Sequence, residues 1–262
     1  MSDAWIRALV ALPFGLAIGS FMTVVVSRVP AGESVLQPRS RCTSCGTEIR
    51  NRDNVPVLSW VLLRGRCRSC GERISARYPL LELSTASLVV AAAAAYEQIW
   101  LAAMIAAFLS LMPAVAWIDI EHRIIPNRIT YPAFLGFSAY VVVAWLFDGG
   151  TDPVRALAGA LLYGGLLFVV ALVSRGMGMG DVKLALVIGV VLGAVGLRYV
   201  GVAAAGAVLF GGIGGIVALI VGRNRKAMIP FGPYMAAGAV VGAFWGAPIA
   251  EWYLRSFSAA AL

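Results

Sequence analysis

Two aspartates, Asp119 and Asp181, stand where long apolar runs meet polar or glycine-rich sequence. Asp119 closes the run LAAMIAAFLSLMPAVAWI and opens the polar stretch DIEHRIIPN, whereas Asp181 follows GMGMG and precedes a second apolar run. A carboxylate at membrane depth is costly and therefore points to a function. If the two acids meet, one carboxyl keeps its proton while the other ionises. The ionised partner can take a proton from water while the protonated partner polarises a carbonyl.

Asp181, considered by itself, could have a purely structural role. An aspartate at the start of a helix can accept hydrogen bonds from the first backbone amides and so cap the helix. Pairing with Asp119 favours the chemical reading, because both acids must then share one side of the membrane.

The composition places the chain among polytopic membrane proteins built only from helices. Hydrophobic residues make up 60% of the 262 residues, charged residues only 13%, and the mean hydropathy is +0.86. A helix needs about 20 apolar residues to cross the hydrocarbon core. Eight segments qualify as candidate transmembrane helices, the sixth being short: Ala4–Ser27, Tyr78–Ala95, Trp100–Ile118, Thr130–Phe147, Val154–Val173, Val182–Leu197, Val200–Val221 and Pro233–Leu254.

The distribution of basic residues orients this array. If the chain threads alternately from an outside N-terminus, 17 of the 21 Lys and Arg residues fall in inside segments. The positive-inside rule therefore explains the net charge of +8 and makes nucleic acid a poor partner. Asp119 and Asp181 then both face the cytoplasm. The first segment has Asp3 in place of a basic leader and an apolar stretch too long for a signal peptide, so it is expected to be a retained helix.

Four cysteines lie in the one sizeable polar segment, between the first two spans. They are spaced Cys42-x2-Cys45-x21-Cys67-x2-Cys70, and each pair ends in a glycine that permits a tight turn. Such spacing predicts one structural zinc ion with a closed shell of four thiolates, which would help fold a segment too short for its own core. A redox dithiol pair and two disulfides are the alternatives, although disulfides require an oxidising compartment.

Several strings in this chain resemble a known family in order and over nearly the whole length. GLAIGSFMTVVVSRVP, PRSRCTSCG and NVPVLSWVLLRGRCRSCGERISARYPLLEL resemble the amino-terminal part of bacterial type IV prepilin peptidases. WIDIEHRIIPNRIT and GMGMGDVKLALVIG are similar to the two catalytic motifs of that family, and IPFGPY to its carboxy-terminal signature. Thr23 and Arg66 depart from the family pattern, where Asn and Lys are expected.

The resemblance implies an intramembrane aspartyl protease of the bacterial inner membrane, with Asp119 and Asp181 as its catalytic pair. Its substrates would be prepilins or pseudopilins, and it would also methylate the new amino terminus with S-adenosylmethionine. The stretch Arg64-Gly65-Arg66 is expected near the methyl-transfer site. The sequence does not distinguish pilus assembly from type II secretion as the pathway. It also does not indicate the oligomeric state.

Other residues are expected to shape the site. The glycines before Asp181 would let an extended substrate approach. Lys183 would influence the electrostatic field of the carboxylates or anchor a helix end. The prolines around Gly232 would break a helix entry near the site. The site-shaping set is Gly176, Gly178, Gly180, Lys183, Pro230 and Gly232. Glu82 is expected to pair with a nearby arginine, and the lone His122 to be a surface residue.

The expected domains are a first transmembrane helix (1–27), a cytoplasmic zinc-binding domain with the four cysteines (28–77) and a transmembrane peptidase domain (78–262). Two other functional classes are alternatives to the protease interpretation. Glycine-broken helices with acids also occur in ion-coupled transporters, which could use Asp119 and Asp181, but no inverted repeat is visible. A membrane scaffold with a zinc-bearing loop leaves the paired acids unexplained.

Overall fold

The computed structural model describes residues 2–147, 150–174, 177–221 and 230–258. Throughout these residues the regular elements are helices, and the only strand-like features are two isolated β-bridges in the polar loop. The elements are α1 (Ser2–Arg28), a 3-10 turn η1 (Asn51–Asp53), α2 (Leu58–Leu62), α3 (Arg77–Ala95), α4 (Ile99–His122), α5 (Asn127–Leu146), α6 (Pro153–Val173), α7 (Met179–Val195), α8 (Leu197–Ile220) and α9 (Gly232–Ser258). The predicted all-helical class is confirmed.

Seven helices of the described chain are long and apolar enough to cross a membrane: α1, α3, α4, α5, α6, α8 and α9. The predicted sixth span corresponds to α7, which has 17 residues. At 1.5 Å per residue, α7 is about 26 Å long, slightly less than the hydrocarbon thickness of about 30 Å. It packs against α4, α5, α6, α8 and α9, so protein surrounds most of its surface. A single residue, Gly196, separates it from α8.

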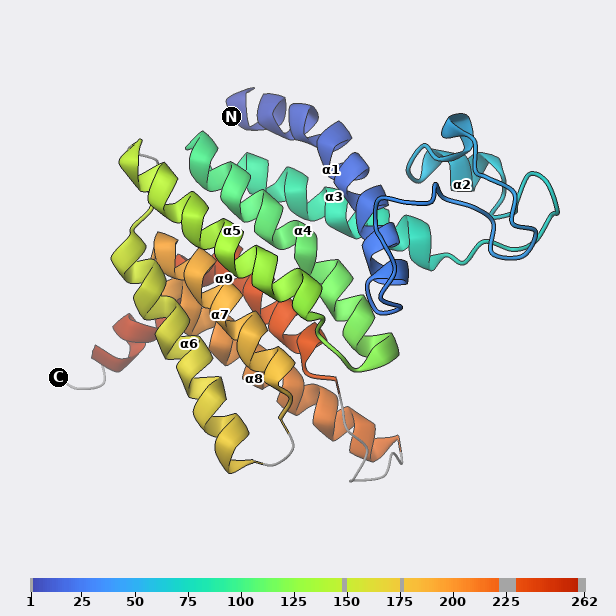
Figure 1. Ribbon diagram of the computed structural model, residues 1–262. Helices are drawn as coiled ribbons and strands as arrows, with labels where there is room; N and C mark the ends of the chain where they lie inside the picture. Colours follow the sequence, from blue (N-terminus) through green and yellow to red (C-terminus); the bar gives the residue numbers. More distant parts are fainter. Residues whose placement is uncertain (1, 148–149, 175–176, 222–229, 259–262) are drawn as a thin grey trace.

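The bundle has two parts that meet through α4, α7 and α9. At one side α1 packs on α3 and α3 on α4, while α6 packs on α7 and α8 on α9 at the other. Figure 1 shows that the C-terminal ends of α1, α4, α6 and α8 lie on one side of the bundle, together with the N-terminal ends of α3, α5, α7 and α9. The polar loop carrying α2 extends from this same side.

Glycines allow the tightest helix contacts. A Cβ added to Gly189 would lie 2.6 Å from the Cα of Ala160, and one added to Gly193 would lie 2.6 Å from the carbonyl oxygen of Arg155. Gly238 and Gly242 make equally close contacts with α8. Since lipid provides no hydrophobic force between helices, close backbone packing of this kind holds such bundles together.

Gly211 and Gly215 have the same spacing as Gly189 and Gly193 but different surroundings. Gly211 lies against the side chain of Phe231, but Gly215 has open space where its side chain would be. The small-x3-small spacing at these two positions therefore does not mark a helix–helix contact along its full length.

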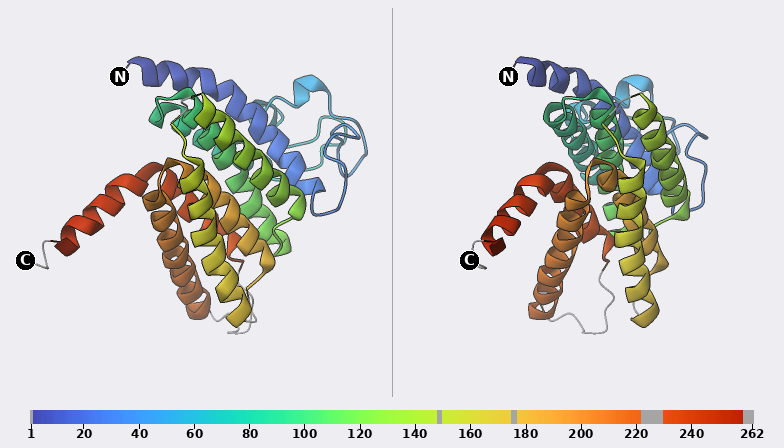
Figure 2. Two further views of the ribbon diagram at one scale, coloured as in Figure 1. Left: turned by 60° about the vertical axis from the view of Figure 1, so that its left-hand side comes forward. Right: turned by 90° about the vertical axis from the view of Figure 1, so that its left-hand side faces the viewer.

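Helix α9 is bent, and its C-terminal part leaves the bundle (Figure 2). Pro248 lies within this helix. A proline inside a helix removes one backbone hydrogen bond and clashes with the preceding turn, which accounts for the bend. The N-terminal part of α9 stays in the core, where Met235 and Ala239 are fully buried.

Candidate active site

Asp119 lies in the last turn of α4 and is buried, with 5% of its surface exposed. Its Oδ2 atom accepts a hydrogen bond of 2.8 Å from the backbone N–H of Gly232, the first residue of α9. The carboxylate thus lies at a helix N-terminus, where unpaired amides and the helix dipole favour a negative charge. A Cβ at position 232 would lie 2.8 Å from the same oxygen, so this contact requires glycine.

Asp181 is the third residue of α7 and is partly exposed. Its carboxylate lies near Gly178, the N-cap residue of α7: a Cβ built on Gly178 would be 3.7 Å from Oδ2 of Asp181. This position in the first turn of α7 is compatible with the capping role considered for Asp181. It does not isolate Asp181 from the other acid, because the charge of Asp119 also acts on the Asp181 carboxyl.

The loop between α4 and α5 connects the two acids. Arg123 ends α4 in the left-handed conformation, with φ 56°, and Ile125 is buried two residues later. A Cβ on Gly180 would lie 3.0 Å from the Cβ of Ile125. Gly180 therefore serves close packing of α7 against this loop, a different use from the open substrate approach expected from the sequence. Gly176 lies outside the described residues.

Lys183 is directed toward α5. Its Nζ donates a hydrogen bond of 2.8 Å to Oδ1 of Asn127 and lies 4.9 Å from the centre of the Tyr131 ring. No ion pair between Lys183 and either aspartate is present among the described residues. Of the two roles expected for this lysine, the contacts correspond to anchoring a helix end. Pro230 is partly buried and lies two residues before α9.

One residue near Asp181 was missed by the sequence analysis. Tyr163 of α6 is 3% exposed, and its hydroxyl has no hydrogen-bond partner among the described residues. The charge of Asp181 acts on this hydroxyl. The available signal was a hydroxyl in the apolar middle of α6, but aromatic residues on apolar helices are too common for this signal to be distinctive.

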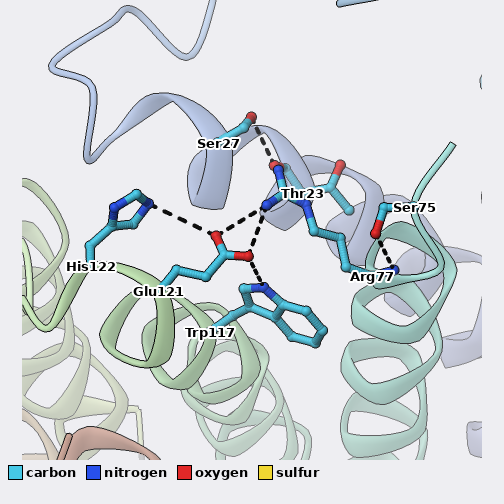
Figure 3. Close-up of polar contacts among 7 residues, drawn as sticks. All are labelled: Thr23, Ser27, Ser75, Arg77, Trp117, Glu121 and His122. Carbon is cyan, nitrogen blue, oxygen red and sulfur yellow. Dashed lines mark hydrogen bonds and ion pairs between the residues drawn. The ribbon is translucent and has the colours of Figure 1, made fainter.

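A second polar cluster joins α3 to α4 (Figure 3). Arg77 donates to both carboxylate oxygens of Glu121 at 3.0 Å, and the indole of Trp117 donates to Glu121 at 2.8 Å. His122 lies at the edge of this cluster, exposed and 3.9 Å from Glu121. Thr23 of α1 is 9% exposed and bonds back to the carbonyl of Ser20. The contacts of Glu121 tie the start of α3 to the end of α4 without involving Asp119 or Asp181.

Among the residues that the structure describes, Glu82 has no arginine partner of the kind that was expected. Its Oε2 atom instead accepts a hydrogen bond of 2.7 Å from the backbone N–H of Val57, just before α2. The partner is a backbone amide of the polar loop, which a search for opposite charges in the sequence cannot find.

The four cysteines of the polar loop form one cluster. Their Sγ atoms all lie within 4.8 Å of one another, and those of Cys42 and Cys70 are 3.8 Å apart. Zn–S bonds of about 2.3 Å in a tetrahedron place sulfur atoms about 3.8 Å apart, whereas a disulfide needs about 2.05 Å. All four thiols are free. The cluster therefore fits a tetrahedral metal ion and does not fit two disulfides.

Two matching turns build this cluster. In the first, Cys42 N–H bonds to the Thr47 carbonyl; in the second, Cys67 N–H bonds to the Glu72 carbonyl. The glycine after each pair has positive φ, 70° at Gly46 and 73° at Gly71. Each turn thus presents its two thiols from one side of the backbone, as a metal knuckle requires.

An ion pair joins the rest of the loop to the second turn. Arg68 binds Asp53 of η1 with a shortest contact of 2.6 Å. The hydrogen bonds and charge of Arg68 hold the pKa of the Asp53 carboxyl below its usual value. The pair is therefore charged at neutral pH and links η1 to the metal cluster.

The fold and site together define a multi-pass membrane protein with two acids gathered at one end of the bundle and a cluster of four cysteines beside that end. Residues 14–96 match the model of the bacterial peptidase A24 N-terminal domain, and residues 105–222 match that of the type IV leader peptidase family. The chain belongs to this leader peptidase family.

Relatives match along almost the whole chain. The chain is 34% identical over 281 residues to a prepilin leader peptidase/N-methyltransferase of Aeromonas hydrophila, covering 97% of this chain and 96% of that one. It is 35% identical over 243 residues to a protein of the same name from Bacillus subtilis (strain 168), covering 92% and 96%. No solved structure is significantly similar. The family assignment removes support for the transporter and scaffold interpretations.

Proposed function

We propose that this protein is an aspartyl endopeptidase that removes the leader peptide from prepilins and pseudopilins, with Asp119 and Asp181 as its catalytic pair. The observation that carries the proposal is the placement of two acids at the same end of the bundle, one in the last turn of α4 and one in the first turn of α7, with Asp119 fixed by the first amide of α9. The names of the full-length relatives support the same reaction and substrate class.

The chemistry requires one carboxylate and one carboxylic acid. The carboxylate takes a proton from water, whose oxygen attacks the peptide carbonyl carbon, while the carboxylic acid donates its proton to the carbonyl oxygen. Collapse of the tetrahedral adduct breaks the C–N bond, and a proton passes to the departing amine. The protein fixes one oxygen of Asp119 through Gly232, so this carboxyl is held in place before the substrate arrives.

The position of the two acids fits a substrate cut at the membrane boundary. Asp119 is three residues from the end of α4, and Asp181 is two residues from the start of α7. Each therefore lies within about one helical turn, or about 5 Å, of the end of its helix. A basic leader followed by a long apolar helix would place its scissile bond at this depth.

The proposed orientation has this end of the bundle facing the cytoplasm of a bacterial cell, in the inner membrane. The ten arginines of residues 28–77 support it through the positive-inside rule. We retain the division into a first helix (1–27), a four-cysteine domain (28–77) and a peptidase domain (78–262). Because the loop is itself basic, recognition of a basic leader would depend on the apolar segment of the substrate more than on charge.

Replacing either acid tests the protease proposal. Asp119→Asn and Asp181→Asn should each lower the rate of prepilin cleavage by at least about 1,000-fold, because each removes one of the two proton-transfer groups. Cleavage is followed by mass spectrometry with purified enzyme and a candidate prepilin in proteoliposomes. Asp152→Asn is the control variant. Asp152 caps the N-terminal end of α6, which lies away from the two acids, and this variant should retain near-normal activity because asparagine caps a helix as well as aspartate does. Robust cleavage by a folded Asp181→Asn protein would exclude the dyad.

We propose zinc as the metal of the four-cysteine cluster, with a structural role. Cys42, Cys45, Cys67 and Cys70 would occupy all four coordination positions, which leaves none for a reactive water. The metal would supply folding free energy to a loop that has few buried side chains of its own.

Metal analysis tests this assignment. The wild-type protein should contain about one zinc per chain, and Cys67→Ser should lose it and melt at a lower temperature. Ser69→Ala, in the same turn, should keep both the zinc and the melting temperature. A wild-type protein that is free of metal, or a Cys67→Ser protein with unchanged zinc content, would contradict the proposal.

We also propose that the protein methylates the new amino terminus with S-adenosylmethionine, as the names of its relatives indicate for them. The stretch Arg64-Gly65-Arg66 forms the turn after α2, in which Gly65 packs on the ring of Trp60. This turn belongs to the loop, whereas the two acids belong to the bundle, so the two activities would use separate groups.

Separate sites predict that the activities can be uncoupled. The Asp181→Asn protein should methylate a pre-cleaved pilin at the wild-type rate when S-adenosylmethionine is supplied, although it cannot cut the precursor. Product N-methylation is measured by mass spectrometry, with wild-type enzyme as the reference. If wild-type enzyme leaves the pre-cleaved pilin unmethylated, the methyl-transfer proposal fails and the protease proposal is unaffected.

A further inference from the structure

The short helix α2 exposes three apolar side chains on one face. Leu58, Val61 and Leu62 are 54%, 57% and 71% exposed, and their i, i+3, i+4 spacing places them together. The other face is fixed to the loop: Ser59 is buried and bonds to the Arg52 carbonyl, and the Trp60 indole bonds to the Ile74 carbonyl. Within the described residues, the outward face of α2 has no protein covering it.

The hydrogen bond from Val57 to Glu82 sets the depth of α2. Glu82 is five residues beyond Arg77, where the membrane-spanning helix α3 starts, and is therefore about 7.5 Å along the helix. Val57, which immediately precedes α2, donates its N–H to this side chain at 2.7 Å. The start of α2 is thus held close to the beginning of a membrane-spanning helix; Figure 1 shows α2 in the polar loop on the side where α3 begins.

The Val57 backbone is strained to make this contact. Its φ of 62° lies in the left-handed region, which a β-branched residue rarely adopts. Such a conformation persists only where surrounding contacts impose it. The bond to the buried carboxylate of Glu82 is one such contact, so the residue that precedes α2 has a fixed position relative to α3.

Exposed apolar side chains are also present on α3, close to Glu82 in the sequence. Leu80 and Leu83 of α3, on either side of Glu82 in sequence, are 55% and 46% exposed. Arg64 and Arg66 lie two and four residues after the end of α2. Apolar side chains flanked by arginines are typical of segments that lie in the membrane interface, where basic groups meet anionic lipid headgroups.

We infer that α2 lies in the interface of the lipid bilayer and anchors the four-cysteine loop to the membrane surface through Leu58, Val61 and Leu62. The occupant of the exposed face is lipid of the leaflet on the loop side. Backbone contacts transmit the anchoring to the metal cluster: Gly65 N–H bonds to the Trp60 carbonyl, and Ile74 N–H bonds to the Gly65 carbonyl. This inference is independent of the protease proposal.

Photo-crosslinking in a bilayer tests the inference. A diazirine-bearing amino acid is introduced at Val61 of the full-length protein, which is then placed in nanodiscs of phosphatidylcholine and phosphatidylglycerol and illuminated. Mass spectrometry of the labelled peptide should show lipid adducts at position 61. Leu161, an exposed residue of the membrane-spanning helix α6, is the positive control, and Ser44, exposed in the first metal turn, is the negative control.

The result at position 61 should resemble that at Leu161, with lipid adducts, and not that at Ser44, where only water adducts are expected. The same label at Leu62 repeats the test if the Val61 protein does not fold, as judged by size-exclusion chromatography and zinc content. Only water adducts at both positions, or adducts to a second protein chain in place of lipid, would overturn the inference.

Discussion

A buried carboxylate must have a hydrogen-bond donor, and the first amide of α9 supplies one to Asp119. A hydrogen bond to a charged group contributes about 1.5–3 kcal/mol, and leaving such a group unpaired costs more. The end of α4 and the start of α9 therefore stay together, although more than one hundred residues separate them in the chain. The glycine at position 232 is part of this constraint, because any side chain there would occupy the place of the carboxylate.

The second acid is placed by packing. Helix α7 lies inside the bundle, with Gly189 and Gly193 against the backbone of α6 and Gly180 against Ile125. These contacts fix the height of α7 relative to α4, and so bring Asp181 into the electrostatic field of Asp119. Because the two acids come from different helices, small shifts of either helix would change their separation. Close backbone contacts, which tolerate little displacement, suit this requirement.

The polar loop is organised by a different balance of forces. It has few buried side chains, and four thiols, an ion pair between Arg68 and Asp53, and the bond from Val57 to Glu82 hold it together. A metal ion at the thiols and lipid against α2 would both supply free energy that the loop cannot obtain from a core of its own. Such a loop can remain beside the end of the bundle that holds the acids.

Sequence patterns predicted what depends on local order: the helices, the two metal turns and the two acids at helix ends. They failed where a contact joins distant segments. Nothing in the sequence indicated that Gly232 binds Asp119, that Lys183 is held by Asn127, or that Glu82 accepts from Val57. Gly211 and Gly215 have the same spacing as Gly189 and Gly193, yet Gly215 faces open space, since spacing alone does not tell which face meets a neighbour.

The central claim is that Asp119 and Asp181 act as one unit. The most direct test is a double-mutant cycle of prepilin cleavage, with the rates of Asp119→Asn, Asp181→Asn and the double variant measured on protein of equal thermal stability. If both acids serve one proton-transfer unit, the double variant should be no slower than either single variant. A double variant whose loss equals the product of the two single losses would show that the acids act independently, and would contradict this account.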